Sequence, residues 1–87
     1  MDNESTKITQ EHLNKLKENT IYPNPFEDYF IVNSLQDDVF ILQSLAGAII
    51  GQYKVGKGET KITTNLSRGV YIGRLQKQSQ TFKIVKQ

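Results

Sequence analysis

The stretch "IYPNPFEDYFIVN", Ile21 to Asn33, sets two prolines in front of a run of aromatic and β-branched residues. A proline fixes its own φ, biases the residue before it toward extended geometry and has no N–H for a strand ladder. We therefore expect Tyr22 to Pro25 to form a sheet edge or a corner, where a linker becomes a domain. Asn24 is expected to hydrogen-bond nearby backbone in a turn, and Phe26 to fill the core as a plug.

The run after the prolines predicts a strand with two apolar faces. Side chains alternate along a strand, so Phe30 and Val32 share one face while Tyr29 and Ile31 share the other. A strand that is apolar on both faces is expected in the centre of a sheet.

Outward from this strand, short apolar alternations are separated by turn residues roughly every 8 to 12 positions, which is typical of a small β-sandwich. The fold class is therefore predicted to be all-β, an antiparallel sandwich of about seven strands. The expected strands are Ile21 to Tyr22, Tyr29 to Asn33, Val39 to Ser44, Ile49 to Lys54, Thr60 to Thr64, Val70 to Gln76 and Thr81 to Lys86.

Two of these strands show which side chains face the core. Phe40 and Leu42 are expected to point inward. In the last strand Phe82 and Ile84 alternate with Thr81, Lys83 and Val85. This alternation is typical of an outer strand with one wet face and with charges that discourage edge-to-edge pairing.

Gly73 interrupts the sixth expected strand. Tyr71 and Leu75 fall on one face of that strand, with Gly73 between them. Because glycine has no Cβ, we expect a neighbouring element to pack closely at this point.

The segment before the sandwich has the residue pattern of a helix rather than of a strand. Met1 to Thr20 contains helix formers, with Ile8, Leu13 and Leu16 roughly on one side. A helix of about ten residues is marginal in water, so we expect a helical or disordered linker, with an amphipathic contact helix as the alternative. The predicted organisation is a linker or short helix over 1–20 and one domain over 21–87.

Length and charge exclude several classes of protein. The 87 residues, 37% of them apolar, suit one domain with a small core. Met1 to Thr20 carries four acidic and three basic residues, and Ile21 to Gln87 carries five acidic and eight basic, for a net charge of +2. This mild excess is not the dense basic patch of a nucleic-acid-binding domain, so no such partner is expected. The acidic start lacks the apolar segment of an export signal, and no run approaches the about 20 apolar residues of a membrane span.

Residues that carry chemistry are few. The chain has no cysteine, and its single histidine, His12, has no partner for a metal site or a catalytic pair. Glu27 with Asp28, and Asp37 with Asp38, point to opposite faces if they lie on strands, so we expect them to aid solubility beside turns. Calcium binding by these loop carboxylates stays open, although the alternating-ligand loop pattern is missing. No catalytic residue, metal site or cofactor is predicted.

Four segments, in this order and spacing, resemble the type A C-terminal sorting domain of cargo proteins of the bacterial type IX secretion system (Por secretion). They are "YPNPFEDYFIV", "VFILQSLAGAII", "NLSRGVYIGRL" and "TFKIVKQ", and together they run from Ile21 to Gln87. The positions that match the opening signature, the central turn and a later strand start are Tyr22, Pro23, Asn24, Pro25, Gly47, Gly69, Val70 and Tyr71.

The sequence departs from the family pattern at the central turn, where Ser44 to Ala48 replaces an Asp followed by Leu-Asn-Gly-Arg. Ser44 still offers an oxygen to the turn, whereas Ala48 lacks the usual basic side chain. Members of this family form the last domain of a large exported protein with a cleavable signal peptide. We therefore expect these 87 residues to be a fragment or a shortened reading frame that a cargo domain normally precedes.

The resemblance implies an immunoglobulin-like sandwich that serves as a non-enzymatic secretion signal. Such a domain is read by an outer-membrane translocon and is then removed by a sortase, which attaches the cargo to anionic lipopolysaccharide. The cargo is expected to cross the periplasm and then to reach the cell surface or be secreted. The expected recognition surface is the last hairpin, Val70 to Lys86, with the basic residues Arg74, Lys77, Lys83 and Lys86.

Two other functions stay open, because a fold does not dictate a function. The sandwich could be an adhesive or carbohydrate-binding accessory module, in which Tyr22, Tyr29 or Tyr53 would form a flat binding strip. It could also be a structural spacer, whose deletion from its parent protein would leave export unchanged.

Overall fold

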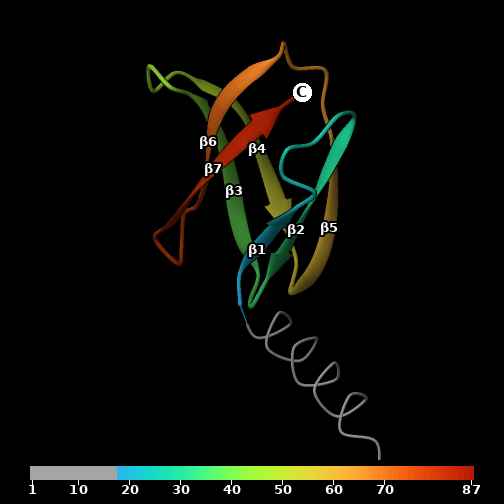
Figure 1. Ribbon diagram of the computed structural model, residues 1–87. Helices are drawn as coiled ribbons and strands as arrows, with labels where there is room; N and C mark the ends of the chain where they lie inside the picture. Colours follow the sequence, from blue (N-terminus) through green and yellow to red (C-terminus); the bar gives the residue numbers. More distant parts are fainter. Residues whose placement is uncertain (1–17) are drawn as a thin grey trace, which may run out of the picture.

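Seven strands in two antiparallel sheets make up the computed structural model, which describes residues 18–87 (Figure 1). The strands are β1 (Thr20–Tyr22), β2 (Tyr29–Ser34), β3 (Asp38–Ser44), β4 (Ile49–Val55), β5 (Gly58–Thr63), β6 (Gly69–Leu75) and β7 (Gln80–Lys86). Each expected strand is present with its ends within two residues of the predicted ones, so the predicted all-β sandwich is confirmed. The expected N-terminal helix or linker, with His12, falls almost entirely outside the described residues.

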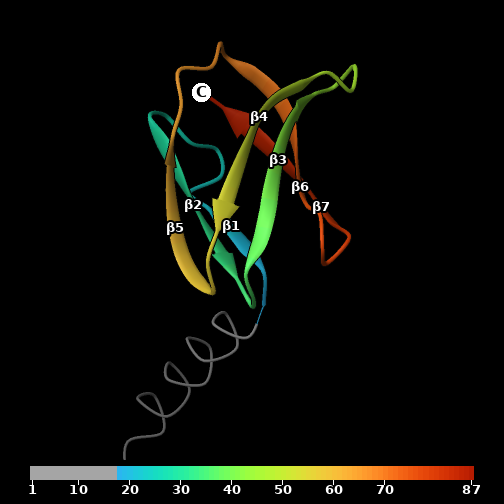
Figure 2. The ribbon, with the colours of Figure 1, turned by 180° about the vertical axis from the view of Figure 1, so that it is seen from behind.

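The two sheets lie face to face, as the front and back views show (Figure 1 and Figure 2). One sheet has the order β1-β2-β5 and the other the order β4-β3-β6-β7. Strand β2 is central in its sheet, as its two apolar faces predicted. Strands β1 and β7 lie at sheet edges, which confirms the two edge predictions. The peptide bonds that precede Pro23 and Pro25, just after β1, are both cis.

The core lies between the sheets and is organised around β2 and β3. Phe30, Val32, Phe40 and Leu42 are fully buried, so the predicted inward faces of both strands are confirmed. The ring centre of Phe30 lies 5.1 Å from that of Phe26 and 5.6 Å from that of Phe40, within the range favourable for edge-on and tilted aromatic pairs. The remaining buried members of this cluster are Val55, Ile62, Leu75 and Ile84.

Gly73 lies where β6 passes the core side chains of its neighbours. A Cβ built at this position would lie 2.7 Å from Cδ1 of Ile84 and would also overlap the ring of Phe40. The close packing expected at this glycine is therefore confirmed, because any side chain at position 73 would displace the core.

Candidate recognition surface

Asn24, between the two prolines of the opening segment, reaches across to the last strand. Its Nδ2 donates a hydrogen bond to the carbonyl of Lys83 at 2.7 Å, and its Oδ1 accepts the backbone N–H of Val85 at 2.9 Å. The side-chain amide thus offers β7 the donor and the acceptor that a neighbouring strand would offer. The prediction that Asn24 would hydrogen-bond nearby backbone in a turn was wrong, because its partners lie 59 and 61 residues away in the sequence.

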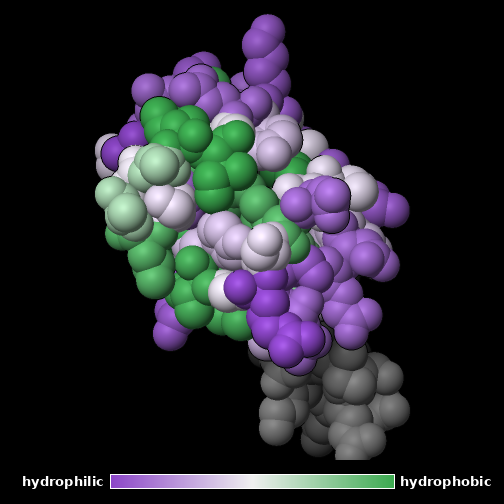
Figure 3. Space-filling view, turned by 90° about the horizontal axis from the view of Figure 1, so that it is seen from above, coloured by the Kyte–Doolittle hydropathy of each residue, from purple (hydrophilic) through white to green (hydrophobic). Residues whose placement is uncertain are grey.

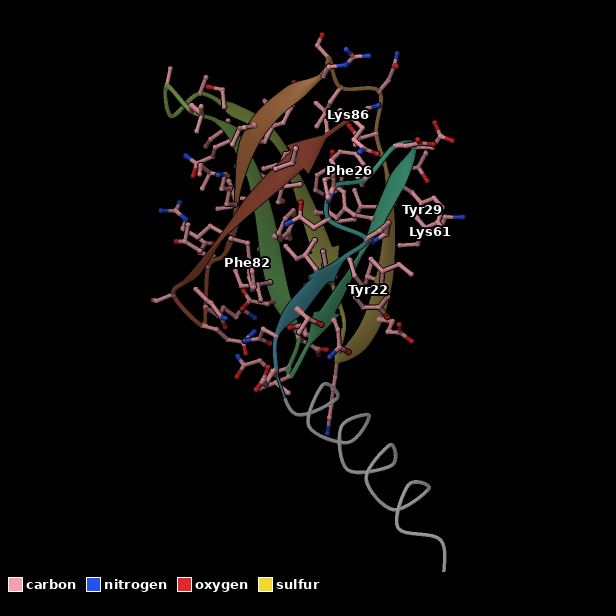
Figure 4. All side chains as sticks on the ribbon, viewed as in Figure 1. Tyr22, Phe26, Tyr29, Lys61, Phe82 and Lys86 are labelled. Atoms are coloured by element: carbon pink, nitrogen blue, oxygen red, sulfur yellow. The ribbon has the colours of Figure 1, made fainter. Side chains whose placement is uncertain are left out.

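Phe26 continues this contact through its backbone. Its N–H donates to the carbonyl of Val85, and its carbonyl accepts the N–H of Gln87, both at 2.9 Å. A parallel bridge joins Phe26 to Lys86, and the two residues lie close together at this end of the sandwich (Figure 4). The ring of Phe26 is fully buried, which confirms its predicted role as a core plug. Residues 24–26 therefore cover part of the outer edge of β7, so the opening segment and the last strand form one structural unit.

The four basic residues predicted for recognition occupy different parts of the β6–β7 hairpin. Arg74 and Lys83 are exposed and lie on the face of the sheet that is turned away from the core. Lys77 is exposed in the turn between the two strands. Lys86 is half-buried, and its Nζ lies 5.8 Å from the ring centre of Phe26. Arg74 and Lys83 thus share one face, whereas Lys77 and Lys86 lie at opposite ends of β7.

Several signature residues shape the turns that lead into these hairpins. Gly47 has a φ of +92° between β3 and β4, a conformation that glycine adopts without steric cost, and its N–H donates to the carbonyl of Ser44 at 2.9 Å. The Oγ of Ser44 accepts the N–H of Ala48 at 3.1 Å, which confirms the oxygen expected for this turn. The hydroxyl of Tyr71 donates to the carbonyl of Ser67 at 2.6 Å, just ahead of β6. Gly69 and Val70 open that strand.

Asp38 is a residue whose role the sequence prediction missed. The side chain was expected to aid solubility beside a turn, but it is buried. Its Oδ1 accepts the N–H groups of Val39 at 2.6 Å and of Lys77 at 2.8 Å. Its Oδ2 accepts the N–H of Gln78 at 3.2 Å and the side-chain Nε2 of the same residue at 2.9 Å. The carboxylate therefore ties the start of β3 to the β6–β7 turn.

These contacts decide how Asp38 titrates. Burial raises the pKa of this carboxyl, but the N–H of Lys77, the side-chain amide of Gln78 and the N–H of Val39 together outweigh that effect and leave the pKa below its ordinary value. Donors that face a carboxylate favour its charged form. Asp38 is therefore ionised at neutral pH and serves as an acceptor rather than as a proton donor.

Gln78 and Asn19 extend this polar cluster to the other sheet. The Nε2 of Gln78 also donates to Oγ of Ser34 in β2 at 3.1 Å, and its Oε1 accepts Nδ2 of Asn19 at 3.0 Å. The Oδ1 of Asn19 accepts the N–H of Leu35 at 2.8 Å. No motif in the sequence marks these two residues, because their partners come from distant parts of the chain.

The three tyrosines considered for a binding strip lie on two different sheets. Tyr22 and Tyr29 are exposed on the three-stranded sheet, where Nζ of Lys61 lies 4.3 Å from the ring centre of Tyr29 (Figure 4). Tyr53, in β4 of the other sheet, is half-buried, packs against the core cluster and lies over Gly51. The structure therefore does not unite the three rings in one strip.

Residues 18–87 contain no group of three or more His, Cys, Asp or Glu side chains placed to hold a metal ion. Over the same residues, no helix has the length and apolar character needed to cross a membrane.

Comparison with known families matches the sandwich as a whole. A family model described as "Secretion system C-terminal sorting domain" matches residues 20–87. No curated protein and no solved structure gives a significant match. The matched region contains all seven strands, and with them the opening segment and the last hairpin.

Proposed function

The chain belongs to the family of type IX secretion system C-terminal sorting domains, and from this we propose that it directs an exported cargo protein through the outer-membrane translocon. The observation that carries the proposal is the family match, which spans the complete sandwich rather than one motif. The family is one of sorting signals, not of enzymes. The domain accordingly acts as a non-enzymatic secretion signal that is joined to a preceding cargo domain.

The finer steps of the route follow from the same proposal. The cargo crosses the periplasm and then reaches the cell surface or is secreted, and a sortase removes the sorting domain on surface attachment. We place the cut before Ile21, because a protease needs extended and accessible backbone and the two sheets begin at β1.

Recognition is assigned to the basic residues of the last hairpin, Arg74, Lys77, Lys83 and Lys86. Three of them are exposed, and the fourth is held beside Phe26 at the end of β7. The opening signature supports this surface indirectly, since Asn24 and Phe26 hold the outer edge of β7 in place.

A reporter fusion tests the proposal. A signal peptide, a fluorescent protein and the 87-residue chain are joined in that order and expressed in a bacterium with a type IX system. Surface or medium fluorescence is expected, and a matched fusion that lacks residues 70–87 should remain inside the cell. Retention of an intact full fusion in the cytoplasm or periplasm would overturn the proposal.

A further inference from the structure

The outer face of the four-stranded sheet carries a group of aliphatic side chains, which we call the apolar face. Cross-strand partners share a face of a sheet, and the register places Ile41 opposite Arg74, and Gln43 opposite both Ile49 and Ile72. Val70 lies opposite Val85 on the same face. The apolar face consists of Ile41, Ile49, Ile50, Val70, Ile72 and Val85.

Several aliphatic side chains on and beside the apolar face are strongly exposed to solvent. Ile49 is 55% exposed and Ile50 is 42% exposed, and Leu45 in the adjoining turn is 67% exposed. Ile41 is only 3% exposed although its side chain is turned away from the core, so the neighbouring side chains of the face cover it. Seen from above, hydrophobic residues gather on one side of the molecule (Figure 3). Single exposed apolar residues are ordinary, but a contiguous group marks an interaction surface.

A β-bulge produces part of this exposure. The register between β3 and β4 shifts between Leu42 and Gln43, so that Gly51 faces Leu42 while Ile49 faces Gln43, and Ile50 is the extra residue. A bulge of this kind re-aims side chains at a sheet edge. Two adjacent isoleucines are thereby both exposed, where regular alternation would have buried one of them.

The exposed charged side chains on the strands of this sheet are all positive. Arg74, Lys83 and Lys54 are exposed on the outer face of this sheet. From residue 39 to residue 87 the chain has eight basic residues and one acidic residue, Glu59, which lies in β5 of the other sheet. Asp38, at the start of β3, is buried. Asp37, exposed in the β2–β3 turn, accepts the N–H of Lys57 at 3.1 Å and so lies at the Lys54 end of β4. Arg74 and Lys83, on β6 and β7, have no acidic side chain on their own strands.

We propose that the apolar face, with Arg74, Lys83 and Lys54 around it, is the docking surface for a protein partner whose contact surface has an apolar centre and carboxylates at its rim. The inference rests on the proposed sorting function and specifies the chemistry of the partner that reads it. Interfaces combine an apolar centre with a polar rim, and rim charges of opposite sign steer the encounter. The docking surface therefore keeps Arg74 and Lys83 from the basic residues proposed above and adds Lys54, whereas Lys77 and Lys86 lie away from this face.

A protein fits this face better than a lipid surface does. Side chains that anchor a protein at a bilayer are commonly Trp and Tyr, and interfacial elements present bulky aromatic and aliphatic residues from a protruding helix or loop. The outer face of the four-stranded sheet has no aromatic side chain, and its aliphatic residues lie on strands within a sheet. Aliphatic side chains on a sheet, flanked by cations, suit a partner protein with an apolar surface and carboxylates at its rim.

Two matched pairs of variants of the reporter fusion test the docking surface. The first pair is R74E/K83E on the face against K57E/K61E away from it, and both change the net charge by the same amount. The second pair is Ile50→Asn against Leu35→Asn in the β2–β3 turn, two apolar residues that are 42% and 41% exposed. The face variants should lower surface delivery by roughly tenfold or more, and the control variants should stay within about twofold of the parent.

Folding and lipid binding are measured on the same 87-residue variants. Circular dichroism melting should give similar Tm values for all four variants, because each substituted side chain is exposed. If one of the double variants fails to fold, the single variants Lys83→Glu and Lys61→Glu take its place. Flotation with vesicles of phosphatidylcholine and phosphatidylglycerol should show no binding that depends on Arg74 and Lys83.

The outcomes separate the two proposals. Failure of the parent fusion to leave the cell overturns the sorting function itself. Delivery of the parent together with equal delivery of face and control variants overturns the docking surface alone. Vesicle binding that R74E/K83E abolishes overturns the protein partner in favour of an anionic lipid.

Discussion

Asn24 and Val85 are joined by a hydrogen bond from the backbone N–H of Val85 to the side-chain oxygen of Asn24, at 2.9 Å. Together with the bond from Asn24 to the carbonyl of Lys83, it makes one side chain serve as a short neighbouring strand for β7. Unpaired edge strands are liable to pair with other chains, and covering them avoids this. The opening signature and the basic last strand, far apart in the sequence, are therefore parts of one surface.

Replacing Asn24 by alanine should loosen this edge. Asn24→Ala removes one donor and one acceptor from β7 at an exposed site, so we expect the free energy of unfolding to fall by about 1 kcal/mol. Hydrogen exchange of the Val85 amide should accelerate more than that of Ile72 in β6. Asn65→Ala, at an exposed loop position, is the control and should change neither quantity. Unchanged exchange at Val85 in Asn24→Ala would contradict the role given to this side chain.

Adding one methyl group at Gly73 should disturb the core. The new Cβ of Gly73→Ala would lie 2.7 Å from Ile84 Cδ1 and against the ring of Phe40, so we expect a loss of about 1–3 kcal/mol in the free energy of unfolding. Gly56→Ala is the matched control, because a Cβ there meets only Oδ1 of Asp37, at 3.8 Å. Urea denaturation of both variants measures the difference. Equal urea midpoints for the two variants would contradict this prediction, because they would show that the core side chains can move to accept a Cβ at position 73.

A feature of this structure could be predicted from the sequence when the residues that produce it are close together in the chain. The strands and the inward faces of Phe30 and Phe40 were predictable, because alternation is a local pattern of neighbouring residues. The edge position of β1 followed from the prolines, which act on their own backbone. The common face of Arg74 and Lys83 could also have been deduced from strand alternation, since they lie on one hairpin.

The features that were missed depend on contacts between distant residues. The two hydrogen bonds of Asn24 to β7 join residues 59 and 61 positions apart in the sequence. The hydrogen bond of Asp38 to Gln78 joins residues 40 positions apart. No local sequence pattern encodes such pairs. The exposure of both Ile49 and Ile50 results from a bulge, which breaks the alternation on which a prediction from sequence relies.

Two tyrosines should respond differently to truncation. Tyr53 is half-buried against the core and covers Gly51, so Tyr53→Ala is expected to lower the free energy of unfolding by about 2 kcal/mol. Tyr29 is exposed and has a cation–π contact with Lys61, so Tyr29→Ala should cost less than about 1 kcal/mol. Thermal melting of both variants checks this order. A larger loss in Tyr29→Ala would mean that the outer face of the three-stranded sheet supports the fold more than its exposure suggests.

Stability should fall in acid through Asp38. Its folded-state pKa lies below the ordinary value, because the hydrogen bonds from Lys77, Gln78 and Val39 outweigh the effect of burial. A carboxyl with a depressed folded pKa stabilises the protein at pH values above its unfolded pKa of about 4, and this stabilisation is lost as the pH falls through the folded pKa. The free energy of unfolding should therefore decline below about pH 5.

Asp38→Asn should be less stable by about 1–3 kcal/mol at pH 7 and should show a shallower decline in acid. Asp28→Asn, at an exposed loop position, is the control and should keep the stability of the parent at pH 7. Parallel acid profiles for the parent and Asp38→Asn, measured by urea denaturation at each pH, would assign the acid sensitivity to another carboxylate.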